Sequence, residues 1–215
     1  MTEIGGRGRK LLLVSGFLAS LLAVCTDVLV GMLCEGYSFT SQSISELSAI
    51  GSPTRSIAFV LNLVYAALLI AFGLGVWKSS RNRAMRIIAG LLLANAAISI
   101  IVVTFFPMNL GEAVGIIHLG LMAFNVIFLQ MLTIILGAVA FRNWFRLYSL
   151  GTILAFLVLT VFGIFIAPQV ILGPPQSGLQ ERVMGYGYLL WQALLSLALL
   201  RMKTMTPKKA LNSLD

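Results

Sequence analysis

The chain has 215 residues, of which 59% are hydrophobic and 10% are charged, and its mean hydropathy is +0.99. A soluble domain carries about 25% charged residues, so this composition excludes an ordinary water-soluble globule. The formal net charge of +8 at pH 7 could indicate a nucleic-acid partner, but the positions of the basic residues argue against one.

Apolar stretches long enough to cross a membrane recur along the chain, since a helix needs roughly 20 residues to span a hydrocarbon core of ~30 Å. They predict six spans, at about 11–33, 54–77, 86–106, 113–137, 147–167 and 180–200. We expect the first stretch to remain as an uncleaved span. Because little chain is left over and no alternating strand pattern is present, the sequence predicts an all-α polytopic integral membrane protein. Its six-helix bundle forms a single transmembrane domain over residues 1–215.

Nearly all of the Lys and Arg residues fall on one side of this span pattern. They are Arg7, Arg9, Lys10, Lys78, Arg81, Arg83, Arg86, Arg142, Arg146, Arg201, Lys203, Lys208 and Lys209. Only Arg55 and Arg182 fall on the other side. Because basic residues concentrate in cytoplasmic loops, we expect both termini in the cytoplasm, in a multi-pass protein of the inner (plasma) membrane. The basic residues then have anionic membrane lipids as their partners, and no nucleic acid.

The first non-cytoplasmic connection carries signals for a short helix at about 44–50. Ser43 and Glu46 have the spacing of a capping box, in which a hydroxyl and a carboxylate satisfy free backbone N–H groups at a helix start. Gly51 suits a helix end, and Pro53 suits the first turn of the next span. We expect the 44–50 helix to lie at the outer membrane interface.

Polar side chains inside membrane spans are costly, so they usually face a partner or a cavity. Asp27 is the only acid well inside a predicted span. Helical spacing places Arg55 with Asn62 on one face, and His118 with Asn125 on another. A cavity open to the non-cytoplasmic side would satisfy these faces together. The predicted ligand-binding residues are Glu46, Arg55, Asn62, His118, Asn125 and Arg182.

Each of these residues also has a structural interpretation. Asn side chains often join membrane helices by hydrogen bonds worth about 0.6 kcal/mol. Asp27 could be neutral, or it could pair with Arg55 or Arg182 for architecture alone. His118 could cap a loop.

One segment resembles the signature of a known prokaryotic membrane family. The pattern Ser-Glu-Leu-Ser-Ala-x-Gly-x-Pro-x-Arg at positions 45–55 is its most specific part. Phe106-Pro107 and His118 also fit the pattern. The family is designated domain of unknown function family 998, and the resemblance covers nearly the whole chain. It implies a six-helix integral membrane protein and draws attention to Glu46, Arg55 and His118, but it implies no activity.

Three functions remain open from the sequence. The first is a binding or transport-type protein whose polar pocket takes a lipid headgroup or a small anion, with Arg55 near the helix N-terminus that also favours anions. The second is an intramembrane lipid hydrolase or transferase. His118 would act as base, Asp27 or Glu46 would orient it, and a serine such as Ser45 would be the nucleophile.

The third function is a structural or partner subunit, for which the small residues of the second and third spans could provide close packing. The oligomeric state stays open. A three-histidine zinc site is excluded because the chain has one His. No phosphate-binding loop, dinucleotide motif or haem ligand pair is present, so we predict no metal and no cofactor.

Overall fold

The computed structural model describes residues 2–109, 113–161 and 177–202. Within these ranges the chain is helical and has no strand, which confirms the predicted all-α class. The helices, in chain order, are α1 (Thr2–Leu33), the 3₁₀ helix η1 (Ile44–Ser48), α2 (Arg55–Ser79), α3 (Arg83–Phe105), α4 (Ala113–Phe124), the π-helix η2 (Asn125–Gln130), α5 (Met131–Ala140), α6 (Trp144–Val161) and α8 (Ser177–Arg201).

The described residues contain six helices that are long and apolar enough to cross a membrane. They cover Gly6–Leu33, Arg55–Ser79, Arg83–Phe105, Ala113–Ala140, Trp144–Val161 and Gly178–Arg201. These ranges agree with the predicted spans, except that the predicted end of the fifth span falls at 162–167, outside the described residues. The π-helix inside the fourth span, where α4, η2 and α5 follow one another without a break, was not predicted.

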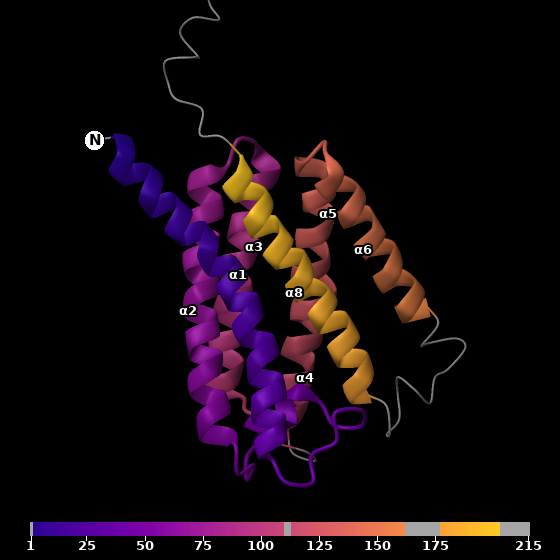
Figure 1. The fold of residues 1–215 in the computed structure, drawn as a ribbon. Helices are drawn as coiled ribbons and strands as arrows, with labels where there is room; N and C mark the ends of the chain where they lie inside the picture. The colour runs from indigo at the N-terminus through magenta and orange to yellow at the C-terminus, as the bar shows by residue number, and fades with distance from the viewer. Residues whose placement is uncertain (1, 110–112, 162–176, 203–215) are drawn as a thin grey trace, which may run out of the picture.

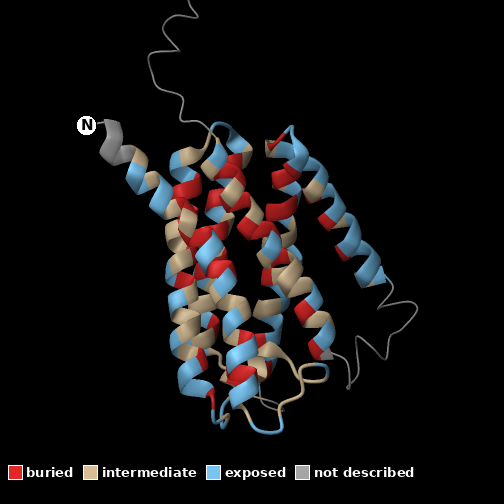
Figure 2. Cartoon of the chain, viewed as in Figure 1, coloured by how far each residue is buried: buried red, intermediate tan, exposed pale blue. Residues whose placement is uncertain are grey.

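The spans pack side by side into one bundle (Figure 1). Helix α1 packs against α2 and α8, α2 packs against α3, and α3 packs against α5, which in turn contacts α6. Buried positions lie mostly on the inward sides of the helices (Figure 2). The exposed residues include many large apolar ones, such as Leu29, Leu147 and Val139. An apolar outer surface is expected where lipid is the solvent.

The dense part of the core lies in the half of the bundle that contains the start of α1. Phe72, Phe145, Trp191 and Leu199 are fully buried there. Glycine allows the close approach of α1 and α2, because a Cβ on Gly75 would lie 2.9 Å from the backbone carbon of Leu12. Small residues of α2 therefore serve packing within the chain.

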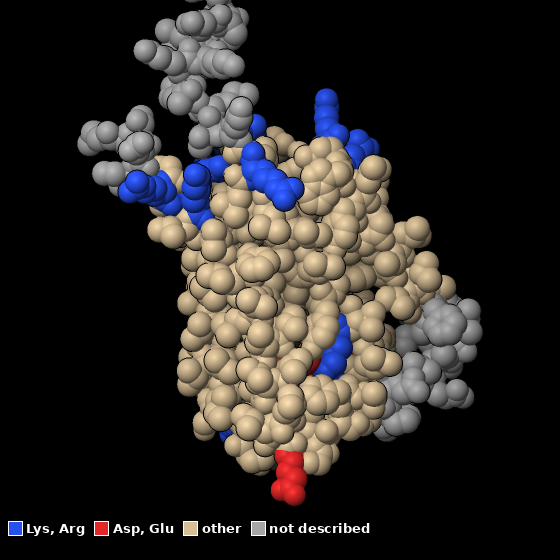
Figure 3. Space-filling model, in the orientation of Figure 1, with Lys and Arg blue, Asp and Glu red and all other residues tan. Residues whose placement is uncertain are grey.

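The ends of the bundle differ in charge. Basic side chains gather at the end where α1 begins, and an acidic side chain lies at the opposite end (Figure 3). This separation agrees with the charge pattern that predicts cytoplasmic termini. We use "outer end" below for the end of the bundle that contains η1, the side expected to face away from the cytoplasm.

The connection between α1 and α2 forms the outer end. The predicted short helix is present as η1, and the Glu46 carboxylate accepts a hydrogen bond from the Ser43 backbone N–H at 2.9 Å, as a capping box requires. The Ser43 hydroxyl also lies 3.1 Å from the same carboxylate oxygen. Gly51 has a φ of 86°, a conformation that glycine adopts without strain, and it ends this segment.

Candidate functional site

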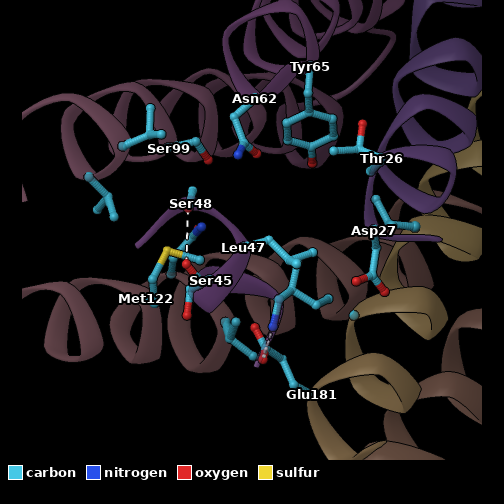
Figure 4. A pocket seen from close by; sticks show the side chains of 18 of the residues that line it. Thr26, Asp27, Ser45, Leu47, Ser48, Asn62, Tyr65, Ser99, Met122 and Glu181 are labelled. Atoms are coloured by element: carbon cyan, nitrogen blue, oxygen red, sulfur yellow. Dashed lines mark hydrogen bonds between the residues drawn. The ribbon is translucent and has the colours of Figure 1, made fainter. Parts of the chain in front are cut away.

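A cavity of about 510 Å³ lies in the outer half of the bundle, beneath η1. Figure 4 shows side chains that converge on it from several elements: Thr26 and Asp27 from α1, Asn62 and Tyr65 from α2, Ser99 from α3, Met122 from α4, Glu181 from α8, and Ser45 and Ser48 from η1. Tyr65 lies ten residues inside α2, or ~15 Å along a helix that rises 1.5 Å per residue. The cavity therefore extends from the outer end toward the middle of the membrane.

The cavity wall combines apolar and polar groups. Its apolar members include Leu61, Val103, Val126 and Leu189. Its polar members are Thr26, Asp27, Ser45, Ser48, Asn62, Tyr65, Asn95, Ser99, His118, Asn125, Gln130, Gln180, Glu181, Tyr186 and Tyr188. No lysine or arginine is among the lining residues of the described chain, so the formal charges in the wall are those of Asp27 and Glu181.

Helix η1 covers the outer end of the cavity, and we call η1 the lid below. Leu47 is buried and packs with Val30 of α1 and Ala58 of α2. The backbone oxygen of Leu47 accepts hydrogen bonds from the Thr54 hydroxyl at 2.9 Å and the Ser52 hydroxyl at 3.1 Å. These contacts fix the lid to the start of α2.

The other side of the lid is joined to α8. The backbone N–H of Ile44 donates to the Glu181 carboxylate at 2.9 Å, and the backbone N–H of Leu179 donates to the carbonyl of Thr40 at 3.0 Å. Glu181 therefore has a structural task besides lining the cavity.

Arg182 forms the centre of a buried polar cluster at the edge of the lid. Its Nε and Nη2 each donate to one oxygen of the Asp27 carboxylate, both at 2.8 Å. Nη1 donates to the backbone oxygens of Phe39 at 2.6 Å, Gln42 at 2.9 Å and Gly178 at 3.1 Å. A guanidinium has five N–H donors, and Nη2 also reaches the Tyr37 hydroxyl, so every donor of Arg182 is occupied by protein.

Tyr37 ties this cluster to the lid. Its hydroxyl donates to the carbonyl of Ser43 at 2.8 Å while it accepts from Arg182. Burial raises the pKa of Tyr37 to about 12, and the neighbouring Arg182 opposes that rise. The phenol is therefore protonated at neutral pH, as its donor role requires.

His118 is buried and is held by the backbone. Its Nδ1 lies 2.8 Å from the backbone oxygen of Phe106. A carbonyl oxygen only accepts, so Nδ1 carries a proton. Nε2 is buried and has no hydrogen-bond partner in the described chain.

Asn125 begins the π-helix η2, a type of irregularity that is frequent at functional sites. Its side-chain N–H donates to Asn95 Oδ1 at 3.2 Å, and Asn95 in turn donates to the Tyr188 hydroxyl at 3.4 Å. The Asn125 Oδ1 atom is buried without a partner in the described chain. Together with Thr26 Oγ1, the cavity-lining residues thus contain three buried polar atoms without a partner in the described chain. Of these, His118 Nε2 and Asn125 Oδ1 can only accept hydrogen bonds.

The structure divides the residues singled out from the sequence into two groups. The cavity is lined by Asp27, Ser45, Asn62, His118 and Asn125. Three predicted ligand-binding residues lie outside this lining: Glu46, Arg55 and Arg182.

Each of the three has a different place. Glu46 holds the lid together through Ser43 and Gln42. Arg55 is exposed at the start of α2. Arg182 is occupied by Asp27 and the lid, so the architectural pairing considered for Asp27 is present, and its partner is Arg182.

Sequence reasoning did not single out Thr26, Tyr65 or Gln130 as site residues. Tyr65 follows Asn62 by three positions and therefore shares its helical face, which is a signal that could have found it. Thr26 neighbours Asp27, but its Oγ1 is buried without a partner in the described chain, a property that only the structure reveals.

The candidate groups for catalysis do not form a connected set. The Ser45 hydroxyl lies 3.0 Å from that of Ser43, the Asp27 carboxylate binds Arg182 and Tyr186, and His118 binds a backbone carbonyl. Among the described residues no group of three or more His, Cys, Asp or Glu side chains could hold a metal ion.

Comparison with known proteins adds a family and no activity. A family model described as "Protein of unknown function (DUF998)" matches residues 17–198. No curated protein and no solved structure matches the chain. The matched region contains all six spans at least in part, together with η1 and every cavity-lining residue. The chain therefore belongs to the DUF998 family of multi-pass membrane proteins of unknown function.

Proposed function

We propose that this protein binds an amphiphilic membrane ligand, such as a single lipid molecule, in the cavity beneath η1. The observation that carries the proposal is the cavity itself. Its volume of about 510 Å³ falls within the range of roughly 300–1,000 Å³ that is usual for small-molecule sites. A wall that combines apolar side chains with hydroxyl and amide groups suits a ligand with an apolar body and a polar head.

The position of the cavity supports a ligand taken from the non-cytoplasmic side. The residues that line the cavity lie in the half of the bundle that contains η1. The basic side chains gather at the opposite end (Figure 3). If the basic end faces the cytoplasm, as the positive-inside rule predicts, the lid and cavity belong to the outer leaflet. The lid contacts to α2 and α8 then close the cavity toward the outer aqueous phase.

The anion considered from the sequence has less support than a lipid. An anion in a low-dielectric site needs a cation or several aligned donors. Arg55 lies outside the lining, and Arg182 has no donor left for a ligand. We therefore propose the amphiphile, without a requirement for an anionic group.

Neither alternative function has a specific observation in its favour. A hydrolase that uses His118 would need a nucleophile and an orienting carboxylate in contact with the imidazole, and the described contacts of His118 include neither. For a partner subunit, Ala66, Gly73 and Gly75 are buried within the chain, whereas Ala67, Gly90 and Ala97 are exposed, and nothing in the structure shows what covers them.

Native mass spectrometry of protein extracted from membranes in a mild detergent tests the proposal. A Leu61→Trp variant places a bulky ring where Leu61 lines the cavity, and Val60→Trp, at an exposed neighbouring position, is the matched control. We expect the wild type and Val60→Trp to retain a bound lipid mass and Leu61→Trp to lose it. Thermal unfolding of both variants shows whether each is folded. Equal lipid retention by two folded variants, or no bound mass in the wild type, would overturn the proposal.

A further inference from the structure

We infer that the polar head of the bound ligand carries no negative charge and donates hydrogen bonds to two protein atoms, His118 Nε2 and Asn125 Oδ1. This inference rests on the proposed binding function and specifies the ligand of the same cavity. It comes from two buried atoms without partners and from the charges of the wall.

The first acceptor is set by the backbone. The Phe106 carbonyl holds the Nδ1 proton of His118 at 2.8 Å. In the neutral imidazole the other nitrogen, Nε2, is then an acceptor. His118 is 4% exposed, lines the cavity, and leaves Nε2 without a partner in the described chain.

The second acceptor belongs to Asn125, which is 1% exposed and lines the same cavity seven residues further along the span. Its side-chain N–H is committed to Asn95, and Oδ1 is left without a partner in the described ranges. Positions seven residues apart share a helical face. The two acceptors therefore belong to one wall.

Buried polar groups are nearly always hydrogen-bonded, so an unsatisfied one calls for an explanation. Two unsatisfied acceptors on one face of one cavity are explained together by a ligand that supplies two hydrogen-bond donors. The two free hydroxyls of a monoacylglycerol supply two such donors, whereas a diacylglycerol has a single hydroxyl and supplies one.

The charges of the wall favour the same head. Its acidic members are Asp27, which is already paired with Arg182, and Glu181, which accepts a hydrogen bond from Ile44. No lysine or arginine lines the cavity in the described part of the chain. A phosphate placed there would meet carboxylates without a compensating cation, which is unfavourable in a low-dielectric environment.

Two lipids with the same acyl chain test the inference: monooleoylglycerol, with two free hydroxyls, and oleoyl lysophosphatidate, with a phosphate in place of one of them. Purified delipidated protein is titrated with each in detergent, and binding is read by native mass spectrometry. We expect monooleoylglycerol to bind at least tenfold more tightly. Free glycerol serves as a third ligand, and equal binding of glycerol would show that the head comes from a soluble polyol and would overturn the lipid source.

Variants of Asn125 and His118 test whether these two acceptors cause the preference for the uncharged lipid. Asn125→Leu removes one acceptor and should weaken monooleoylglycerol binding about tenfold. Ser99→Ala is the matched control, because Ser99 lines the cavity but its hydroxyl is occupied by the Asn95 carbonyl at 2.9 Å. His118→Phe tests the other acceptor in the same way, with thermal unfolding as the check on folding.

The two proposals fail in different ways. If oleoyl lysophosphatidate binds as tightly as monooleoylglycerol, or if Asn125→Leu and His118→Phe bind like Ser99→Ala, the head chemistry is overturned while lipid binding stands. If neither lipid binds and no lipid is retained on extraction, the proposed function itself is overturned.

Discussion

Arg182 and Asp27 are 155 residues apart in sequence, yet they form a two-point ion pair inside the bundle, with N–O distances of 2.8 Å for both contacts. The side chains are 7% and 1% exposed, so neither charge is solvated by water. The pair joins α1 to α8, and the remaining donors of Arg182 hold the chain that leads into η1. It is one of several polar links between the bundle and the lid.

Removal of the Asp27 charge should therefore destabilise the protein. Asp27→Asn leaves the Arg182 charge buried without a counter-ion, and breaking a buried pair in this way costs about 3–5 kcal/mol. The measurement is the midpoint of thermal or SDS-induced unfolding in the same detergent. Glu35→Gln, which removes an exposed acid between α1 and η1, is the control and should leave the midpoint unchanged. An Asp27→Asn midpoint equal to that of the control would contradict a structural role for the pair.

A second prediction concerns the contact between α8 and the lid. A Cβ on Gly178 would collide with the backbone oxygen of Gln42, one of the carbonyls that Arg182 binds. Backbone cannot move aside as a flexible side chain can, so we expect Gly178→Ala to cost about 1–3 kcal/mol and to increase amide hydrogen exchange in residues 37–50. On the same helix, a Cβ on Gly185 would meet nothing within 4 Å. Gly185→Ala should be neutral or stabilise the helix by up to about 1 kcal/mol.

The hydroxyl of Tyr37 should make the stability of the folded protein depend on pH in the alkaline range. The pKa of Tyr37 is about 12 in the folded protein, above the ordinary value of 10. As the pH rises, Tyr37 therefore loses its proton in the unfolded chain at a lower pH than in the folded protein. The stability that Tyr37 contributes is fully present below pH 10 and is lost between pH 10 and pH 12.

Tyr37→Phe removes this titration and the hydrogen bond to Ser43, which is worth about 1 kcal/mol. We expect the variant to be less stable at neutral pH and to approach the wild type as the pH rises from 10 to 12. Unfolding midpoints of the two proteins across this range measure the difference, because the other titrating groups are common to both. A difference that is constant with pH would show that Tyr37 does not titrate in this way.

The helices could be predicted from the sequence because each span satisfies its own backbone and needs only enough apolar length. Which residues line the cavity depends on contacts between segments that are distant in the sequence. The sequence identified Asp27 as a group in need of a partner, but Arg55 and Arg182 were equally compatible with that need. The choice of Arg182 follows from the packing of α1 against α8.

The same limit explains the outcome for Arg55 and Asn62. Their spacing of seven residues places them on one helical face, and Asn62 does line the cavity. Arg55 occupies the first position of α2, at the outer end of that face, and it is exposed. Helical periodicity predicts which side of a helix a residue lies on. It does not predict how deep in the bundle the cavity begins, because that depth depends on the position of the lid. The π-helix at Asn125 is a further local change that apolar periodicity does not reveal.

The orientation in the membrane is the last prediction, and cysteine labelling tests it. The native cysteines, Cys25 and Cys34, are free and can be replaced by alanine to give a background without thiols. In that background Glu35→Cys places a thiol at an exposed position at the outer end, and Arg142→Cys places one in the turn between α5 and α6 at the basic end. A membrane-impermeant maleimide should label Glu35→Cys in intact cells, whereas it should label Arg142→Cys only after permeabilisation. The reverse pattern would place the cavity on the cytoplasmic side, and the ligand would then have to come from the inner leaflet.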